Sequence, residues 1–314
     1  MTRIAIQIEP QWGYTYQEVK ATAVAAESSG WDGLWLSDHI LWDAESTDRN
    51  CFEAWTLLTA LATATETLRL GTLVTCNSYR HPSLLAKTAA GIDVISDGRV
   101  DFGIGAGWKE EEYRAYGYDF PGIGTRQRQL SEAIDLTRLL WTEPYADFEG
   151  EHYRLERAVC APKPHQSPMP IWVGGHGDNL LRIVAEKADG WNMVFGRALD
   201  VLSDRHAVLD RHCADIGRDP ASIMRSIFLF TAIADDQAEV DAIQADLTTR
   251  LGPAAEMFMG AGEAAGLIGP ADRVAEGLRA HLALGFDGLH LLFPYGHEIG
   301  QIERFSVEVI DQLA

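Results

Sequence analysis

The sequence predicts an α/β barrel of eight parallel strands, each followed by at least one helix, with two insertions. Short apolar segments alternate with helical stretches eight times within 314 residues. The segments are almost continuously apolar, which is typical of parallel strands covered on both faces. No Pro/Gly/Ser-rich linker or charge run divides the chain, so we expect one domain over residues 1–314. An open doubly wound sheet uses the same elements, but eight units favour the closed barrel.

The elements follow from apolar periodicity and from Gly, Pro and Asp at their ends. The first helix has an apolar stripe of Val19, Ala23 and Ala26 and stops at Gly30. We expect strands at residues 4–8, 32–37, 68–76, 100–105, 171–173, 190–194, 227–233 and 288–292. We expect helices at residues 16–29, 53–65, 82–95, 109–116, 126–141, 178–187, 200–216, 271–284 and 299–313.

Two segments depart from this alternation. Residues 145–168 have the periodicity of a hairpin and several prolines, which predicts an insertion. Residues 237–268 have helical pieces interrupted by Gly252–Pro253 and by three later glycines. This second segment suits another insertion or a mobile cover that closes over the site.

Composition and charge indicate which partners, metal sites and cellular location to expect. The formal net charge of -20 disfavours nucleic acid and anionic membrane surfaces as partners. The four cysteines are far apart and lack zinc-site spacing, so we expect free thiols and no metal site. The chain begins without an apolar signal segment, and no stretch reaches the roughly 18 apolar residues of a membrane helix. We therefore expect a cytoplasmic protein with a small-molecule substrate.

The strongest chemical signal is Asp38–His39, at the end of the second predicted strand. The carboxyl ends of barrel strands carry the active site in this fold class. His39 can exchange a proton near neutrality, and Asp38 can fix its tautomer or hydrogen-bond a cofactor. Trp42 is predicted to lie about one helical turn beyond, and we group it with His39 as a catalytic candidate. The alternative is that Asp38 caps a turn and His39 is a polar loop residue.

The loops after the third and fourth strands contain small residues. Residues 71–77 would let a flat ring approach the backbone, whereas His81–Pro82 is better explained as a helix start. Residues 103–108 have the spacing G-x-G-x-G, which does not match the dinucleotide fingerprint. These glycines either contact a ligand or relieve crowding inside the barrel. We expect residues 110–112, three glutamates, to be a solvated helix start.

A second glycine loop, residues 174–177, follows the fifth strand and precedes a helix. Backbone N–H groups of such a loop and of a helix N-terminus can bind a phosphate, although a plain turn explains the same residues. His290 alternates with leucines on the last strand, and we expect a hydrogen-bonded histidine in the core or the lumen.

Taken together, these motifs resemble the luciferase-like flavin and deazaflavin oxidoreductases, and most closely their coenzyme F420-dependent branch. The resemblance extends over nearly the whole chain and is weakest at residues 197–268. It is carried by SDH at 37–39, EAW at 53–55, LGTLVT at 70–75, YRHP at 79–82, DVISDGR at 93–99, GIGAGW at 103–108, YG at 116–117, LW at 140–141, VGG at 173–175 and ADGW at 188–191.

The resemblance implies a luciferase-like TIM barrel that binds coenzyme F420 at the carboxyl ends of its strands. His39 is then expected near the reactive carbon of the deazaflavin. A bulge behind the ring is implied at Leu73–Val74, which in relatives contains a cis peptide bond. The residues implied to contact the cofactor, including its phosphate, are Asp38, Leu73, Val74, Ala106, Gly107, Trp108, Gly174, Gly175 and His176.

One position departs from the family pattern. In the sugar-phosphate dehydrogenases of this family a catalytic acid stands where this chain has Trp108, which disfavours glucose 6-phosphate as the substrate. The expected activity is hydride transfer between F420 and a small apolar or aromatic molecule, in a pocket walled by Trp12, Trp42 and Trp108. Relatives imply a homodimer. Two alternatives are an FMN-dependent monooxygenase that uses oxygen and a partner reductase, and a non-catalytic flavin-binding protein.

Overall fold

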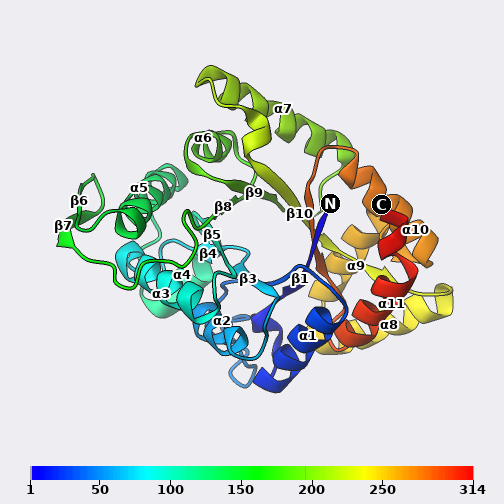
Figure 1. Cartoon of the computed structure of the whole chain (residues 1–314). Coiled ribbons are helices and arrows are strands. Elements are labelled where there is room, and N and C mark those ends of the chain that lie inside the picture. The colour runs from blue at the N-terminus through cyan, green and yellow to red at the C-terminus, as the bar shows by residue number, and fades with distance from the viewer. Residues whose placement is uncertain (1, 195, 314) are drawn as a thin grey trace.

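Parallel strands close into a barrel, as the sequence predicted (Figure 1). The computed structural model describes residues 2–194 and 196–313. Neighbouring strands follow the order β3-β2-β1-β13-β10-β9-β8-β5-β4, and a further pairing of β3 with β5 closes the ring. The barrel strands are β1 (Arg3–Ile8), β2 (Gly33–Leu36), β3 (Arg69–Thr72), β4 (Thr75–Cys76), β5 (Val100–Gly105), β8 (Ile171–Gly174), β9 (Gly190–Met193), β10 (Met224–Phe230) and β13 (Gly288–Leu292).

Helices surround the barrel (Figure 1). They are α1 (Tyr16–Ser28), α2 (Ala54–Ala62), α3 (Pro82–Ile95), α4 (Glu110–Tyr116), α5 (Ile123–Thr142), α6 (Asp178–Lys187), α7 (Leu199–Asp215), α8 (Gln237–Leu251), α9 (Ala254–Ala264), α10 (Ala271–Leu282) and α11 (Glu298–Glu308). Short 3₁₀ turns occur at Pro10–Trp12, Pro220–Ser222 and Ile310–Leu313. A helix or a pair of helices therefore separates most successive strands of the ring, which is the arrangement of a (β/α)8 barrel.

Two predicted strands are divided in the structure. The strand predicted at residues 68–76 becomes β3 and β4, because Leu73 and Val74 interrupt the pairing with β5. The strand predicted at residues 227–233 ends at Phe230, and β11 (Ala232–Ile233) pairs instead with β12 (Ile268–Gly269) outside the barrel. Both divisions depend on the neighbouring strand, which local sequence does not reveal.

The two irregular segments have regular structure. Residues 145–168 contain an antiparallel hairpin of β6 (Ala146–Glu149) and β7 (Arg154–Ala158). Residues 237–268 contain α8 and α9, with the predicted break at Gly252–Pro253. The expectation that Gly260 and Gly262 also break a helix was wrong, since both lie within α9. A Cβ at position 262 would lie 2.9 Å from the side chain of Ile268, so this glycine permits close packing.

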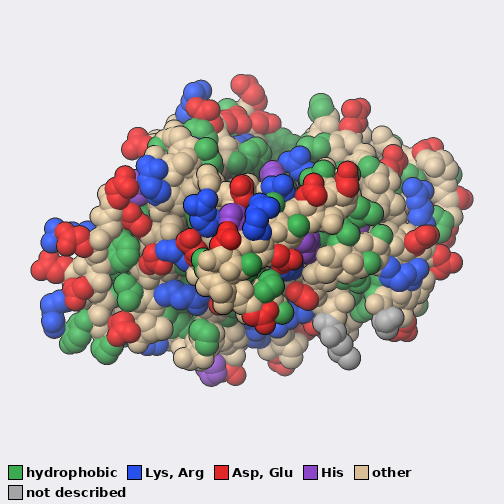
Figure 2. All heavy atoms as spheres, turned by 90° about the horizontal axis from the view of Figure 1, so that it is seen from above, with side chains coloured by type: hydrophobic (Ala, Val, Ile, Leu, Met, Phe, Trp, Pro, Cys, Tyr) green, Lys and Arg blue, Asp and Glu red, His purple; other side chains and the backbone are tan. Residues whose placement is uncertain are grey.

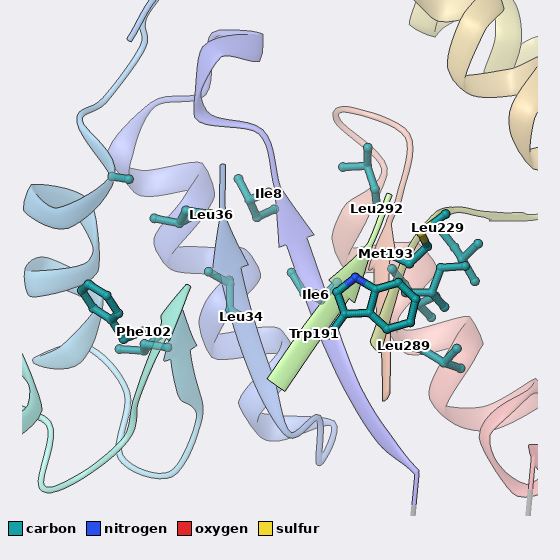
Figure 3. Close-up of a cluster of buried hydrophobic side chains, with 14 of the residues drawn as sticks. Ile6, Ile8, Leu34, Leu36, Phe102, Trp191, Met193, Leu229, Leu289 and Leu292 are labelled. Carbon is teal, nitrogen blue, oxygen red and sulfur yellow. The ribbon is translucent and has the colours of Figure 1, made fainter. Parts of the chain in front are cut away.

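The outer core lies between the barrel and its helices. Alternate residues of each strand face outward, and Ile6, Ile8, Leu34 and Leu36 are fully buried there (Figure 3). Parallel pairing places Ile6 beside Leu34 and Ile8 beside Leu36. This layer fixes the register of β1 and β2, and it therefore fixes where β2 ends.

The lumen holds a separate cluster of Ala5, Trp35 and Trp172, against which Leu73 and Met224 pack. The two indole rings meet edge to face, with centroids 5.5 Å apart. Glycines make room for them. A Cβ at Gly71 would lie 2.6 Å from the ring of Trp35, and one at Gly190 would lie 2.3 Å from the ring of Trp172. Aromatic side chains thus fill the centre of the barrel.

Below this cluster, a cavity of about 290 Å³ lies at the amino-terminal end of the barrel. His290 lines it and packs edge to face on Trp35, with ring centroids 4.6 Å apart. The predicted burial of His290 in the lumen is confirmed. However, its Nδ1 has no hydrogen-bond partner in the described part of the chain, so the histidine is not satisfied as expected.

The surface carries charges of both signs. Acidic and basic side chains are interspersed over the face shown in Figure 2. Within residues 2–194 and 196–313, no helix is both long enough and apolar enough to cross a bilayer.

Replacing Gly190 by Ala tests the packing of the lumen. The new methyl group would overlap the ring of Trp172, which is enclosed by other side chains. We expect the free energy of unfolding to fall by about 1–3 kcal/mol, measured by urea denaturation. The control is Gly91→Ala in α3, where a Cβ meets no atom within 4 Å. That variant should be neutral or stabilised by roughly 0.5–1 kcal/mol. Equal effects of the two substitutions would contradict this account.

Burial lowers the pKa of His290 to about 3, from its usual value of 6.5. Below pH 6.5 the unfolded chain therefore binds a proton that the folded protein excludes, and stability falls as the pH falls towards 3. Between pH 7 and pH 5, we expect His290 to account for a loss of about 2 kcal/mol. His290→Phe should remove that part of the pH dependence in urea denaturation. An unchanged slope would refute the assignment.

Candidate active site

Asp38 and His39 follow directly after β2, at the carboxyl end of the barrel. Outward packing of Leu34 and Leu36 buries the strand to its last residue, so the polar pair begins where apolar burial ends. The segment from here to α2 is a loop, and the expectation that Trp42 lies one helical turn away was wrong. Trp42 is half-buried in this loop, with the Arg49 guanidinium 5.0 Å from its ring centroid.

Asp38 is buried and paired with Arg80. The guanidinium donates two hydrogen bonds, 2.7 Å to Oδ2 and 2.8 Å to Oδ1, and the Cys76 backbone N–H donates a third at 2.9 Å. Burial raises the pKa of Asp38, and the Arg80 charge only partly offsets it. Asp38 therefore joins the end of β2 to β4 and to Arg80, two residues before α3. It makes no contact with the His39 ring among the interactions of the described residues.

Arg80 also pairs with Glu53, whose carboxylate accepts the backbone N–H groups that begin α2. His81 and Pro82 begin α3, which confirms the structural explanation of that pair. The guanidinium thus links two helix starts and one strand end.

His39 is oriented by Glu112. Its Nδ1 lies 2.9 Å from Oε1 and 3.0 Å from Oε2 of that carboxylate. Glu112 is 1% exposed, so the expectation of a solvated acidic helix start was wrong for this residue. Tyr79 donates a hydrogen bond of 2.5 Å to Oε2. Burial raises the pKa of Glu112, but the hydrogen bonds from His39 and Tyr79 outweigh it, and the pKa lies below its usual value.

Trp108 and Lys109 frame the imidazole from the loop after β5. Trp108 is 72% exposed and meets the His39 ring edge to face, with centroids 5.6 Å apart. The Lys109 ammonium donates a 3.1 Å hydrogen bond to the Leu41 carbonyl and another to the Trp42 carbonyl. This loop therefore holds the backbone on which His39 and Trp42 sit.

The peptide bond between Leu73 and Val74 is cis, as the family resemblance implied. The Leu73 side chain packs on the lumen cluster. The Val74 side chain fits against two glycines: a Cβ at Gly105 would lie 2.7 Å from it, and one at Gly174 would lie 2.8 Å from it. The structure thus brings together the bulge after β3, the end of β5 and the end of β8.

The expected cofactor residues after β5 lie beside this bulge. Ala106 is buried, and Gly107 has a φ of +74°. A Cβ on Gly107 would overlap the hydroxyl of Tyr113 and lie 2.6 Å from the sulfur of Cys76. Only glycine fits at position 107, and the reason is local packing, which was the alternative explanation of this loop.

Gly174 ends β8, and Gly175 and His176 lead on from it toward α6; all three are half-buried. Gly177 is the N-cap of α6 and offers no side-chain acceptor to the first backbone N–H groups of the helix. Arg197 lies beside the turn, with its Nη2 3.3 Å from His176 Nε2. Burial, with the charges of Arg197 and Arg205, lowers the pKa of His176. Positive charge and free N–H groups are what an anion site requires.

Further polar residues follow β1 and were not anticipated. Glu9 is buried and accepts hydrogen bonds from Gln7 at 2.8 Å and Gln11 at 2.5 Å. Ser37 donates to Gln11 at 2.8 Å. Trp12, expected to wall the pocket, is 1% exposed and packs edge to face on Phe258. It belongs to the core rather than to an open pocket wall.

A (β/α)8 barrel with a His–Glu pair, a cis bulge and two glycine turns at one end defines a luciferase-like protein. The family model of the luciferase-like monooxygenases matches residues 2–288, and the chain belongs to that family. The fold agrees: the F420-dependent secondary alcohol dehydrogenase in complex with an F420–acetone adduct superimposes with a TM-score of 0.85 and 21% identity, over 100% of this chain and 99% of that one.

Both F420-dependent dehydrogenases and a monooxygenase are similar to this chain in sequence. The F420-dependent hydroxymycolic acid dehydrogenase of Mycobacterium tuberculosis is 31% identical over 71% of this chain and 61% of its own length. The F420-dependent glucose-6-phosphate dehydrogenase of Kineococcus radiotolerans is 32% identical over 69% and 64%. The pyrimidine monooxygenase RutA of Stutzerimonas stutzeri is 31% identical over 73% and 64%. The matched segments thus span less than two thirds of these relatives.

Removing one partner of the Asp38–Arg80 pair should be costly. In Arg80→Leu the buried Asp38 carboxyl loses the cation that pairs with it, and we expect the free energy of unfolding to fall by about 3–5 kcal/mol. Introduced into Asp38→Asn, which has no charge to leave unpaired, Arg80→Leu should cost distinctly less. Chemical denaturation of the four proteins measures this coupling. Additive effects of the two substitutions would contradict it.

Proposed function

We propose that this protein is an oxidoreductase that transfers a hydride between coenzyme F420 and a small apolar or aromatic organic substrate. The observation that carries the proposal is His39, held by Glu112 through Nδ1 at the carboxyl end of the barrel, so that Nε2 is left for a ligand. The F420-dependent relatives support the choice of cofactor.

The described residues fit a flat, phosphate-bearing cofactor. The uncapped start of α6, with Arg197 beside it, suits the phosphate, and Gly174, Gly175 and His176 would hold it. Leu73, Val74, Ala106, Gly107 and Trp108 would line the ring, and Asp38 would hold the end of β2 beside β4 through the bond from the Cys76 N–H. Bound there, the deazaflavin supplies the carbon that accepts or donates hydride.

The chain itself orients the substrate and moves the proton. His39 Nε2 exchanges a proton with the reacting group of the substrate, or stabilises charge on it. Trp42, in the loop after β2, and Trp108, in the loop after β5, would supply apolar walls, and Trp108 has 72% of its surface free for contact. An indole at position 108 in place of a carboxyl group suits an apolar or aromatic substrate better than a sugar phosphate.

An FMN-dependent monooxygenase is the second candidate. The RutA relative and the structural likeness to the monooxygenase RslO1 from Streptomyces bottropensis, with a TM-score of 0.84 and 18% identity, favour it. Its reduced flavin would come from a separate reductase. A protein that binds flavin without catalysis is the third candidate, and the paired His39 argues for a reaction instead.

We also propose a homodimer in the cytoplasm. Leu84 and Ile95 are 61% and 53% exposed on α3 and lie three helical turns apart, so they share a face. Two exposed apolar side chains on one helix face suit burial against a second copy. All four cysteines are free thiols, which fits a reducing compartment.

Cofactor binding distinguishes the candidates. We expect purified apo-protein to bind F420 with micromolar or better affinity, measured by quenching of deazaflavin fluorescence, and to bind FMN more weakly. Arg197→Ala should weaken F420 binding roughly tenfold, as loss of one charged hydrogen bond to a phosphate predicts. Arg279→Ala, remote on α10, is the control. Micromolar FMN binding without F420 binding would overturn the proposal.

Turnover of reduced F420 with a panel of aromatic ketones, imines and enones tests the role of His39. His39→Ala should lower kcat about 10²- to 10⁴-fold while F420 affinity changes little. The control is His165→Ala, an exposed histidine paired with Asp97. If His39→Ala keeps the wild-type kcat, another group transfers the proton and the role proposed for His39 is wrong.

A further inference from the structure

Glu112 is surrounded by hydrogen-bond donors. Its Oε1 accepts the backbone N–H groups of Ile40 at 3.1 Å and Leu41 at 3.4 Å, in addition to the contact with His39. Its Oε2 accepts the Tyr79 hydroxyl. The Lys109 ammonium lies 3.7 Å from Oε1. With 1% of its surface exposed, the carboxylate is satisfied by the protein alone.

These contacts define the protonation of the imidazole. An ionised carboxylate can only accept hydrogen bonds, so the His39 nitrogen that faces it must carry a proton. Burial raises the pKa of Glu112, but the bonds from His39 and Tyr79 and the Lys109 charge keep it below its usual value, and the group stays ionised. The neutral ring is then protonated at Nδ1 and has its lone pair at Nε2.

Within residues 2–194 and 196–313, no other acid contacts this nitrogen. Asp38 precedes His39 in the sequence, but Arg80 occupies both of its oxygens and the Cys76 N–H shares Oδ2. Glu111 accepts the backbone N–H of Ala44 at 2.8 Å, further along the loop. Glu110 is exposed and pairs with Arg114.

The same carboxylate also fixes the backbone under the ring. The hydrogen bonds to Ile40 and Leu41 hold one side of the loop, and the Lys109 ammonium holds the Leu41 and Trp42 carbonyls. Trp108 packs against the ring. Glu112 therefore determines both where the His39 ring lies and which of its nitrogens carries the proton.

We propose that Glu112 is the positioning residue of His39, which holds the imidazole in its Nδ1–H tautomer and presents the Nε2 lone pair to the substrate. The consequence for catalysis rests on the function proposed above. The tautomer itself does not, because it is a property of the protein without substrate.

The test measures the tautomer directly. The full chain is labelled with ¹⁵N-histidine, and long-range ¹H–¹⁵N correlation spectra are recorded at a pH where neutral rings dominate. Among the ten histidines, His39 is assigned by its loss in His39→Ala. We expect Nδ1–H in the wild type, with or without F420. A wild-type ring protonated at Nε2 overturns the proposal without any variant.

Replacing Glu112 by Gln removes the negative charge of the side chain but keeps its size and shape. At the Oε1 position the amide oxygen can still accept the Ile40 and Leu41 N–H groups, while an NH₂ group at the Oε2 position turns a donor toward His39 Nδ1, 3.0 Å away. We expect the His39 tautomer to change or become mixed, and kcat to fall roughly 10- to 100-fold with little change in F420 affinity. Glu110→Gln, on the same helix but exposed, should leave both unchanged. An unchanged tautomer together with an unchanged kcat in Glu112→Gln refutes the positioning role.

The two proposals fail in different ways. If F420 does not bind but the tautomer shifts in Glu112→Gln, the positioning role stands and the cofactor assignment falls. If F420 turns over normally and the tautomer is unchanged in Glu112→Gln, the positioning role falls and the function stands.

Discussion

Two buried carboxylates at the carboxyl end of the barrel, Asp38 and Glu112, determine how the surrounding loops are held together. An ionised group that is removed from water needs donors or a cation close by, and the hydrogen-bond donors to Asp38 and Glu112 come from other segments of the chain. Asp38 takes its partners from β4 and from Arg80, before α3. Glu112 takes its partners from the loop after β2 and from Tyr79. Loops that lack regular structure are thereby joined into one rigid surface, on which the side chain of His39 has a defined direction.

Local sequence predicts the fold well where each element carries its own stop signals. β5, β13, α3 and α6 have the predicted bounds, because Pro, Gly and Asp lie at their ends. The divisions of β3 from β4 and of β10 from β11 were missed, since apolar residues continue across both of them. The strand pairing ends there because of where the neighbouring strand lies, and tertiary structure sets that position. The same is true of Gly262, whose role is close contact with Ile268 rather than helix breaking.

The residues of the site also divide into those that the sequence predicts and those that it does not. His39 was predicted from its place after a buried strand, and the cis bond at Leu73–Val74 came from the family resemblance. Glu112 was missed because three successive glutamates at a helix start usually face water. A signal was present: Lys109, Glu112 and Tyr116 share one helical face, and all three contact the loop after β2. Arg80 gave no local signal, since its partner Asp38 is 42 residues away in the sequence.

The aromatic filling of the lumen also divides the barrel into two separate compartments. Trp35, Trp172 and Leu73 stand between the carboxyl end, where Asp38 and His39 lie, and the 290 Å³ cavity at the other end. Solvent in that cavity is therefore separated by a layer of apolar side chains from the loops that carry these two polar residues. A ligand held at the carboxyl end would be shielded from the opposite opening by this layer, and its exposure to bulk water would depend on the loops at its own end.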